Sequence, residues 1–558
     1  MKNILMALCC AMTMTVLTAC TSDNDDNPAD SSMVGKWCAD VSGKTFAKWN
    51  YGETWQVTEL KADGTGTTDI YYTNKDKPIA REHHDFNYAA AEAAVLTEGL
   101  QKADATMAAK FDKWGKEDLI PVPQPAKFTV FVYGNAGGTM DSAIEKGFWE
   151  VAKKFLTDHD NVRVVCFYKY GKDVVDEQGN HGFTGKYAEP GDIVWFELDS
   201  ETNLDKIKEE GFQAMGFGDQ AIALKLCDPD ALKMFIEISS LVCPAKEYVL
   251  GIWGHGSGFK ATEDVPGKYN VGGSATRGVM GDEWNGEWMD MYEMRDAIKA
   301  TGIDRLNTLF FHNCMMGNLE TQTTIRDCAD YICCSAHVLR SEGEVMAEFV
   351  RGLVDKGNAE DAVAQMFERI TPLWLDEYKD GTVVNGDYKM YRTDRFDGIL
   401  DAAKHLADRL IALYPTQKEA IDRATSKVYR FDPIENELLY PFFDIADYAH
   451  LLAQETDDAE MKTIAAEMDN AFKEAIIHYR DVSWSKEHLD HYTMSVCLLH
   501  QLYYTYDYKS VNPSYLCNYD EGYEQCGFHK YTGWGNWLRM NEQRLNLNPQ
   551  SGGGGPLE

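Results

Sequence analysis

The sequence predicts an α/β protein with a mainly parallel sheet flanked by helices, and three observations lead to this fold class. Between residues 127 and 377, apolar runs of strand length alternate with amphipathic helical patterns, as in parallel sheets with helical crossovers. The apolar runs at 248–253 and 309–313 each end abruptly near a reactive side chain, His255 and Cys314. A β-rich segment precedes this region, and a largely helical segment follows it.

Individual elements have their own signals. Apolar or β-branched runs predict strands, at residues 128–133, 161–168, 193–198, 248–253, 309–313 and 331–334. Asp228 and Pro229 suit the cap and first position of a helix ending near residue 243. The remaining patterns predict a hairpin at 55–60 and 67–72, and helices at 89–114, 291–300, 396–413 and 460–479.

These signals divide the chain into seven segments. In order they are a signal peptide (1–19), a tether (20–32), a β-rich N-terminal domain (33–90), a helical connector (91–126), the α/β domain (127–377), a mainly helical C-terminal region (378–545) and a flexible tail (546–558). At 558 residues the chain is too long for one ordinary core, which agrees with several domains.

The composition is that of a globular and strongly acidic protein. Hydrophobic residues make up 44% of the chain, and the formal net charge is −35. Binding to nucleic acid and electrostatic binding to anionic lipid both need a basic surface. The negative net charge therefore argues against nucleic acid and against anionic lipid as partners.

The N-terminus predicts export. Lys2 precedes an apolar stretch over residues 4–17 that is too short to span a bilayer as a stable helix. The following Leu-Thr-Ala-Cys resembles a bacterial lipoprotein signal, which is cut before the cysteine, here Cys20, whose sulfur is then acylated. The alternative is an ordinary secretory signal with a chance cysteine. We expect a cell-envelope protein, lipid-anchored to the outer membrane through Cys20 alone, facing the periplasm or the cell surface.

The two reactive strand ends predict a catalytic dyad. Parallel strands bring their carboxyl ends to one edge of a sheet, where ligands bind. His255 there is expected to take the proton of Cys314, which makes the sulfur a nucleophile. The backbone N–H groups of Gly256 and Cys314 are the candidates for an oxyanion hole. The residues after Cys314 are expected to start a helix whose N-terminus lowers the thiol pKa.

Non-catalytic roles for these two residues remain open at this point. Cys314 alone fits a buried core thiol, and His255 alone fits a turn residue. Ser257 fails as a serine nucleophile because His255 and Phe259 stand where the nucleophile elbow needs glycine. A metal site that uses His83, His84 and His255 lacks ligand spacing.

The motifs resemble one known family. Residues 228–232, 249–259 and 314–320, with Arg277-Gly278 and 534–538, resemble the clostripain family of caspase-like cysteine peptidases over about residues 127–540. The resemblance implies a caspase-like sheet, a His255–Cys314 dyad, and hydrolysis of peptide or protein substrates through a thioester. It implies no required cofactor, although some relatives need calcium. The alternative is a non-catalytic surface binding lipoprotein on a peptidase-like scaffold.

The sequence departs from the family at the expected specificity pocket. The family usually prefers Arg or Lys at P1 and has an acid two residues before the nucleophile, where this chain has His312. A histidine offers no fixed negative charge, so the P1 preference is expected to change unless Glu342 or Glu344 replaces that acid. Those two glutamates fit a solvated loop equally well.

Family members are often matured by cleavage between the histidine and the cysteine. Lys260, Lys268 and Arg277 are therefore candidate processing sites, and a single uncut chain is the alternative.

Overall fold

The computed structural model describes most of the chain. Its described residues are 32–41, 54–74, 77–89, 92–117, 120–121, 125–135, 140–156, 161–210, 224–256, 258, 279–282, 284, 287–337, 339, 344–377, 387–429, 431, 442–481, 493–498 and 526–544. The predicted signal peptide, the predicted tether up to residue 31 with Cys20, and the predicted tail lie outside them.

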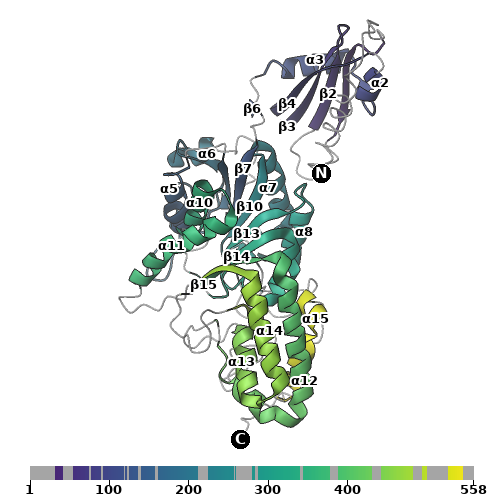
Figure 1. Ribbon diagram of the computed structural model, residues 1–558. Coiled ribbons are helices and arrows are strands. Elements are labelled where there is room, and N and C mark those ends of the chain that lie inside the picture. The colour runs from purple at the N-terminus through teal and green to yellow at the C-terminus, as the bar shows by residue number, and fades with distance from the viewer. Residues whose placement is uncertain are drawn as a thin grey trace.

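The N-terminal unit is a six-stranded sheet that lies apart from the rest of the molecule (Figure 1). Its order is β5 (Gln101–Lys102), β1 (Gly35–Asp40), β2 (Thr54–Leu60), β3 (Thr65–Asn74), β4 (Lys77–Asn87) and β6 (Ile120–Pro121). The predicted hairpin is β2 and β3, which pair antiparallel.

Most of the expected helical connector is part of this unit. α2 (Ala93–Leu96) and α3 (Ala105–Trp114) are helices, but β5 between them pairs with β1. Phe111 and Trp114 of α3 pack on Cys38, Val57 and Tyr71 of the sheet. The alanine-rich sequence indicated the helices, whereas the aromatic side chains of α3 and the aliphatic ones of α2 pack them on the N-terminal unit.

The central sheet has eight strands, and its five middle strands are parallel. The order is β17 (Ile476–Asp481), β15 (Asp387–Arg392), β14 (Ala329–Cys334), β13 (Leu306–His312), β10 (Ala245–Trp253), β7 (Ala126–Asn135), β8 (Val162–Lys169) and β9 (Ile193–Leu198). β9, β15 and β17 are antiparallel to their neighbours. The predicted α/β fold class is confirmed, with every strand expected for the central domain present.

Helices cover both faces of this sheet, so the parallel strands are buried on either side. Leu250 and Ile252 of β10 face the cluster that includes α7 (Pro229–Val242) and α8 (Met291–Lys299). Val249 and Trp253 face the opposite cluster. The helices of that second cluster are α4 (Met140–Ala143), a π-helix (Ile144–Trp149), α5 (Glu150–Ala152), α10 (Glu344–Lys356) and α11 (Ala359–Glu377).

Shorter elements connect these layers. They are a 3₁₀ turn (Leu204–Lys206), α6 (Ile207–Glu210), the hairpin β11 (Met280–Asp282) and β12 (Glu287–Met289), α9 (Leu319–Ile325), and the 3₁₀ turns Arg326–Cys328 and Thr393–Arg395. The α7 start agrees with its sequence signal, because the Asp228 carboxylate accepts from Asp230 N–H at 2.9 Å.

The C-terminal region is a helical layer below the sheet (Figure 1). It holds α12 (Phe396–Thr425), α13 (Ile445–Thr456), α14 (Ala459–Ala475), α15 (Gly527–Thr532) and α16 (Trp534–Arg544), with a two-stranded ribbon of β16 (Phe442–Asp444) and β18 (Ser495–Cys497). The region is not purely helical, since β15 and β17 leave it to extend the central sheet. The helix predicted over 460–479 ends at Ala475 and continues as β17.

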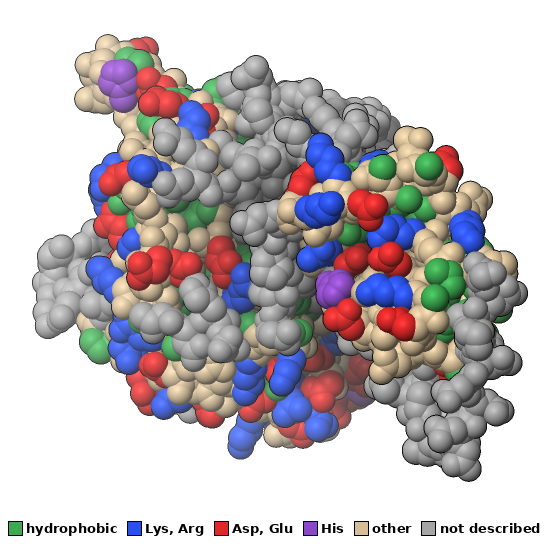
Figure 2. All heavy atoms as spheres, turned by 90° about the horizontal axis from the view of Figure 1, so that it is seen from above, with side chains coloured by type: hydrophobic (Ala, Val, Ile, Leu, Met, Phe, Trp, Pro, Cys, Tyr) green, Lys and Arg blue, Asp and Glu red, His purple; other side chains and the backbone are tan. Residues whose placement is uncertain are grey.

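The surface agrees with the acidic composition. On the face seen in Figure 2, acidic and basic side chains are interspersed over the described residues, and hydrophobic side chains form small groups between them. Such mixed charge keeps a strongly acidic protein solvated without one large field of a single sign.

Candidate active site

The two reactive side chains leave the sheet at corresponding positions of neighbouring strands. β10 and β13 pair in parallel, and their last pair is Trp253 with His312. His255 and Cys314 each follow two residues beyond that pair. Adjacent strands lie about 4.8 Å apart, so this register brings the imidazole-bearing loop alongside the thiol-bearing loop.

Small residues allow the two loops to approach closely. Gly254 has φ 141°, a conformation that favours glycine, and follows the last residue of β10. A Cβ at Gly256 would lie 2.6 Å from the Cys314 carbonyl oxygen and 2.7 Å from the Asn313 Cβ. Any side chain at position 256 would therefore push the histidine loop away from the cysteine loop.

The residue before the cysteine holds the histidine loop from the other side. The Asn313 amide donates to the carbonyl oxygens of His255, at 3.4 Å, and Val279, at 3.2 Å. Asn313 is buried, and so is Val279 at the start of the β11–β12 hairpin. One side chain thus connects both reactive loops to this hairpin.

Cys314 differs from the other described cysteines in its exposure. Ten cysteines of the described residues are free thiols, and nine of them are buried, while Cys314 is only half-buried. Burial raises the pKa of Cys314, and the Leu339 N–H, 3.2 Å from the sulfur, acts in the opposite direction. The resting thiol is therefore protonated near neutral pH and needs a base to become a nucleophile.

The helix expected in the run after Cys314 is present, but it begins near the end of that run. Met315 adopts a left-handed conformation with φ 60°, which turns the chain sharply. α9 begins only at Leu319, where the Asn318 side chain caps it by accepting from Thr321 N–H at 2.8 Å. α9 thus begins five residues beyond Cys314, and, contrary to the expected lowering, the net shift of the Cys314 pKa is upward because burial outweighs the opposing hydrogen bonds.

A comparison with protein-family models finds one match. The model of the clostripain family, a family of C11 peptidases, matches residues 154–539, more than two thirds of the chain. The chain belongs to the clostripain family. It is a cysteine peptidase, and the family resemblance expected from the sequence is confirmed.

Solved structures of C11 proteases are among those similar to this clostripain-family chain. A secreted C11 cysteine protease from Bacteroides thetaiotaomicron, bound to an irreversible peptide inhibitor, is 14% identical, with a TM-score of 0.46 over 73% of this chain and 99% of that chain. An inactive zymogen C11 protease from Parabacteroides distasonis is 13% identical, with a TM-score of 0.45 over 74% and 99%. The comparison with curated proteins finds no match.

His312 is enclosed rather than open to solvent. Its ring stacks on Trp253, with ring centroids 4.0 Å apart and an interplanar angle of 25°. Its Nδ1 is hydrogen-bonded to the Tyr388 hydroxyl at 3.0 Å, and its exposed fraction is 3%. The Trp253 ring and the Tyr388 hydroxyl therefore both contact the side chain at the position where the family usually carries an acid.

The other expected site residues fall into two groups. Glu344 is the first residue of α10 and is half-buried. Glu342, Lys260, Lys268, Arg277 and Cys20 lie outside the described residues, as does Ser257.

Two segments that contact the reactive loops were not predicted from the sequence. The first is the loop after β14, which reaches Cys314 through Leu339 and is anchored on the buried Asp387 of β15. The alternating run 387–392 contains two buried charged residues, Asp387 and Lys389, so it lacks the apolar signal of a central strand.

The second missed support is the β16–β18 ribbon. Ser495 N–H donates to the Gly317 carbonyl at 3.0 Å, and Cys497 N–H donates to the Glu320 carboxylate at 2.9 Å. A Cβ at Gly258 would lie 2.6 Å from the Phe442 ring. The ribbon thus contacts the loops that follow both reactive residues.

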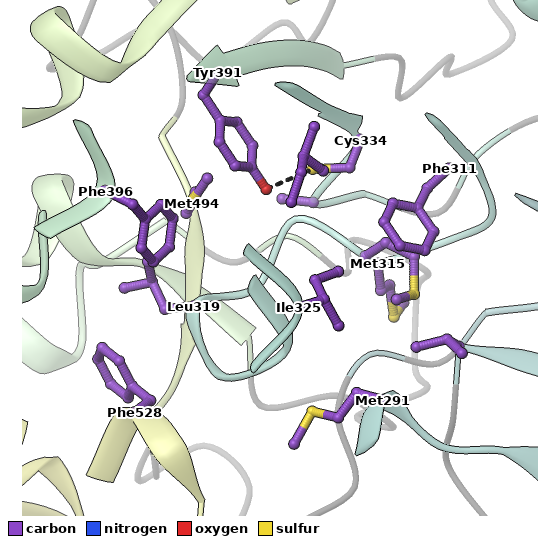
Figure 3. Packing of buried hydrophobic residues seen from close by; sticks show 14 of the residues in the cluster. Met291, Phe311, Met315, Leu319, Ile325, Cys334, Tyr391, Phe396, Met494 and Phe528 are labelled. Atoms are coloured by element: carbon purple, nitrogen blue, oxygen red, sulfur yellow. Dashed lines mark hydrogen bonds between the residues drawn. The ribbon is translucent and has the colours of Figure 1, made fainter. Parts of the chain in front are cut away.

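Apolar packing joins the same parts of the chain. Figure 3 shows Met494 and Phe528 of the C-terminal region in one cluster with Met315 and Leu319, which follow the reactive cysteine. The C-terminal region is thus continuous with the core beneath the active site.

The described part of the chain shows neither a cluster of metal-ligating side chains nor a membrane-spanning helix. No three His, Cys, Asp or Glu side chains among the described residues are arranged to hold a metal ion. No described helix combines the length and apolarity that a bilayer span requires.

Proposed function

We propose that this chain is an exported, lipid-anchored endopeptidase that uses Cys314 as nucleophile and His255 as general base. The observation that carries the proposal is the register of β10 and β13, which sets the two residues at corresponding positions beyond their last strand pair. The exposure of Cys314 supports it, because a nucleophile must reach substrate whereas the other described thiols are buried.

The reaction follows from the chemistry of these groups. The His255 imidazole takes the thiol proton as the sulfur attacks the scissile carbonyl carbon. The backbone N–H groups of Gly256 and Cys314 stabilise the oxyanion. The imidazolium then gives its proton to the leaving amine, which leaves a thioester on Cys314. Water, deprotonated by His255, hydrolyses the thioester and restores the thiol.

A thiol-directed activity probe tests the nucleophile. Folded wild-type protein is expected to label at one site, and folded Cys314→Ala is expected not to label. Cys227→Ala is the matched control, because Cys227 is a free but buried thiol that should not affect labelling. Labelling that persists in Cys314→Ala would reject this nucleophile.

The specificity proposal concerns P1. Position 312 carries a buried histidine instead of an acid, so it supplies no fixed negative charge for Arg or Lys. A cation–carboxylate interaction in a partly buried pocket is worth a few kcal/mol, roughly two decades in selectivity. We propose a reduced preference for basic P1 residues unless Glu342 or Glu344 replaces the acid. A positional-scanning peptide library measures this preference, and strong selection of Arg or Lys would contradict the loss of charge.

Lipid anchoring is proposed from the sequence pattern that ends at Cys20. Wild-type protein expressed in a Gram-negative host should incorporate labelled palmitate and partition into detergent. Cys20→Ser should do neither while retaining peptidase activity. Equal palmitate incorporation by both proteins would exclude Cys20 as the anchor.

A further inference from the structure

The sulfur of Cys314 has a backbone neighbour whose position depends on a separate loop. Leu339 N–H lies 3.2 Å from the sulfur, and the sulfur lies 3.8 Å from the Leu339 carbonyl oxygen. An N–H that points at sulfur favours the thiolate over the thiol. Whatever fixes Leu339 therefore influences how readily Cys314 ionises.

Residues 335–337 and Leu339, here called the β14 loop, are joined to the cysteine loop by backbone hydrogen bonds. Met315 N–H donates to the His337 carbonyl at 2.9 Å, and Gly317 N–H donates to the Ser335 carbonyl at 2.6 Å. A Cβ at Gly317 would lie 2.8 Å from the Ala336 nitrogen, so the two loops are in close contact. These contacts thus hold the β14 loop and the cysteine loop against each other.

Asp387 anchors the β14 loop on its other side. β14 and β15 pair antiparallel up to Cys334 with Lys389, and continuing that register places Asp387 opposite Ala336. The Asp387 carboxylate accepts from Ser335 Oγ, from His337 N–H at 3.1 Å and from Ala336 N–H at 3.4 Å. The carboxylate is fully buried.

The neighbours of Asp387 are hydrogen-bond donors and a cation, so they favour a carboxylate at this position. Lys389, exposed by only 2%, forms an ion pair with Asp387, and the hydroxyl and the two N–H groups are also donors. An amide at this position would turn an NH₂ group toward donors. Burial acts to raise the pKa of Asp387, but Lys389, His337 and these hydrogen bonds outweigh it and hold that pKa below its usual value.

We propose that Asp387 is a positioning residue of the active site, whose carboxylate holds the β14 loop so that Leu339 N–H reaches the Cys314 sulfur. The proposal rests on Cys314 as the nucleophile. Asp387 itself acts only through the loop. Lys389 contributes to the same arrangement, because its ion pair with Asp387 keeps the buried carboxylate ionised.

The pH dependence of Cys314 alkylation tests the proposal. Full-length protein is treated with iodoacetamide between pH 5 and 10, and modification of the Cys314 peptide is followed by mass spectrometry. Asp387→Asn is expected to move the midpoint upward by about half to one pH unit, as loss of one N–H···S hydrogen bond predicts. An unchanged midpoint would overturn the proposal.

Glu145→Gln is the matched control. Glu145 is equally buried and also fixes a loop, since it accepts from Lys186 and Tyr187 N–H groups and from the Tyr170 hydroxyl. Its replacement should lower stability without moving the alkylation midpoint. An equal shift in both variants would reduce Asp387 to a general structural role and overturn the proposal.

A second variant keeps the test decisive where Asp387→Asn does not fold. Ser335→Ala removes a donor to Asp387 that also accepts from His337 N–H at 3.0 Å. It should move the midpoint in the same direction by a smaller amount, and no shift would again overturn the proposal. Alkylation reports the thiol itself, so a failure to hydrolyse peptides would reject the proposed function without deciding this point.

Discussion

The contact between Gly256 and the cysteine loop yields a prediction with a worked magnitude. In Gly256→Ala the new methyl group would lie 2.6 Å from the Cys314 carbonyl oxygen, about 0.8 Å short of the 3.4 Å at which ordinary van der Waals contact begins. Its other near neighbours are Asn313 Cβ at 2.7 Å and Met316 sulfur at 3.2 Å. Two of these three contacts are with atoms that no simple rotamer change can move away.

Relief of this overlap must separate the two reactive loops. A displacement of about 1 Å in a reacting group costs about 10²-fold in rate, so we expect kcat/KM of Gly256→Ala to fall roughly 30- to 100-fold. Overpacking of a filled site costs about 1–3 kcal/mol in unfolding free energy. The assays are peptide hydrolysis under single-turnover conditions and urea unfolding.

Gly352→Ala separates the loss of rate from the loss of stability. Gly352 lies in α10, where an added Cβ would meet the Ala362 carbonyl oxygen of α11 at 2.5 Å. This variant should lose similar stability and keep its kcat/KM within about twofold. The reasoning is refuted if Gly256→Ala retains full activity, or if Gly352→Ala loses as much.

Three further predictions concern charge. His312→Asp is expected to raise the kcat/KM ratio of Arg over Leu at P1 about 100-fold; an unchanged ratio would show that position 312 does not contact P1. Burial, with Asp447 contributing, raises the pKa of Asp444 to about 6. Between about pH 4 and pH 6 the folded state holds a proton that the unfolded state releases. The contribution of Asp444 to the unfolding free energy is therefore fully present below pH 4 and is lost as the pH rises through 6. Measured by urea unfolding at several pH values, the change in unfolding free energy over this range should be about 2–3 kcal/mol smaller in Asp444→Asn than in the wild type. The same change in both proteins would show that another group causes it. A calcium chelator should leave turnover unchanged, and loss of activity that calcium restores would reveal a required ion.

The sequence predicted the parts of the fold whose signal is local and apolar. The strands that end at Trp253 and His312 consist of side chains buried on both faces, so their runs are continuous and their ends are sharp. The edge strand β9 and the helix opened by Asp228 were predicted for the same reason, since each carries its own start or stop signal.

The parts that were missed depend on partners distant in sequence. β15 buries Asp387 and Lys389 as a pair, and neither residue alone indicates a strand within a sheet. β17 follows α14 without a glycine or proline at the boundary, so the helical pattern simply continued into it. At Cys314, the left-handed Met315 breaks the chain direction where no residue type indicated a turn.

The ribbon that contacts the reactive loops has a consequence for biosynthesis. Ser495, which contacts the Gly317 carbonyl, lies 178 positions farther along the chain. A nascent polypeptide that has been made only as far as Cys314 carries the reactive sulfur without the strands that finish its surroundings. If the chain is exported from its N-terminus as proposed, the reactive sulfur crosses the membrane before the strands that complete its surroundings.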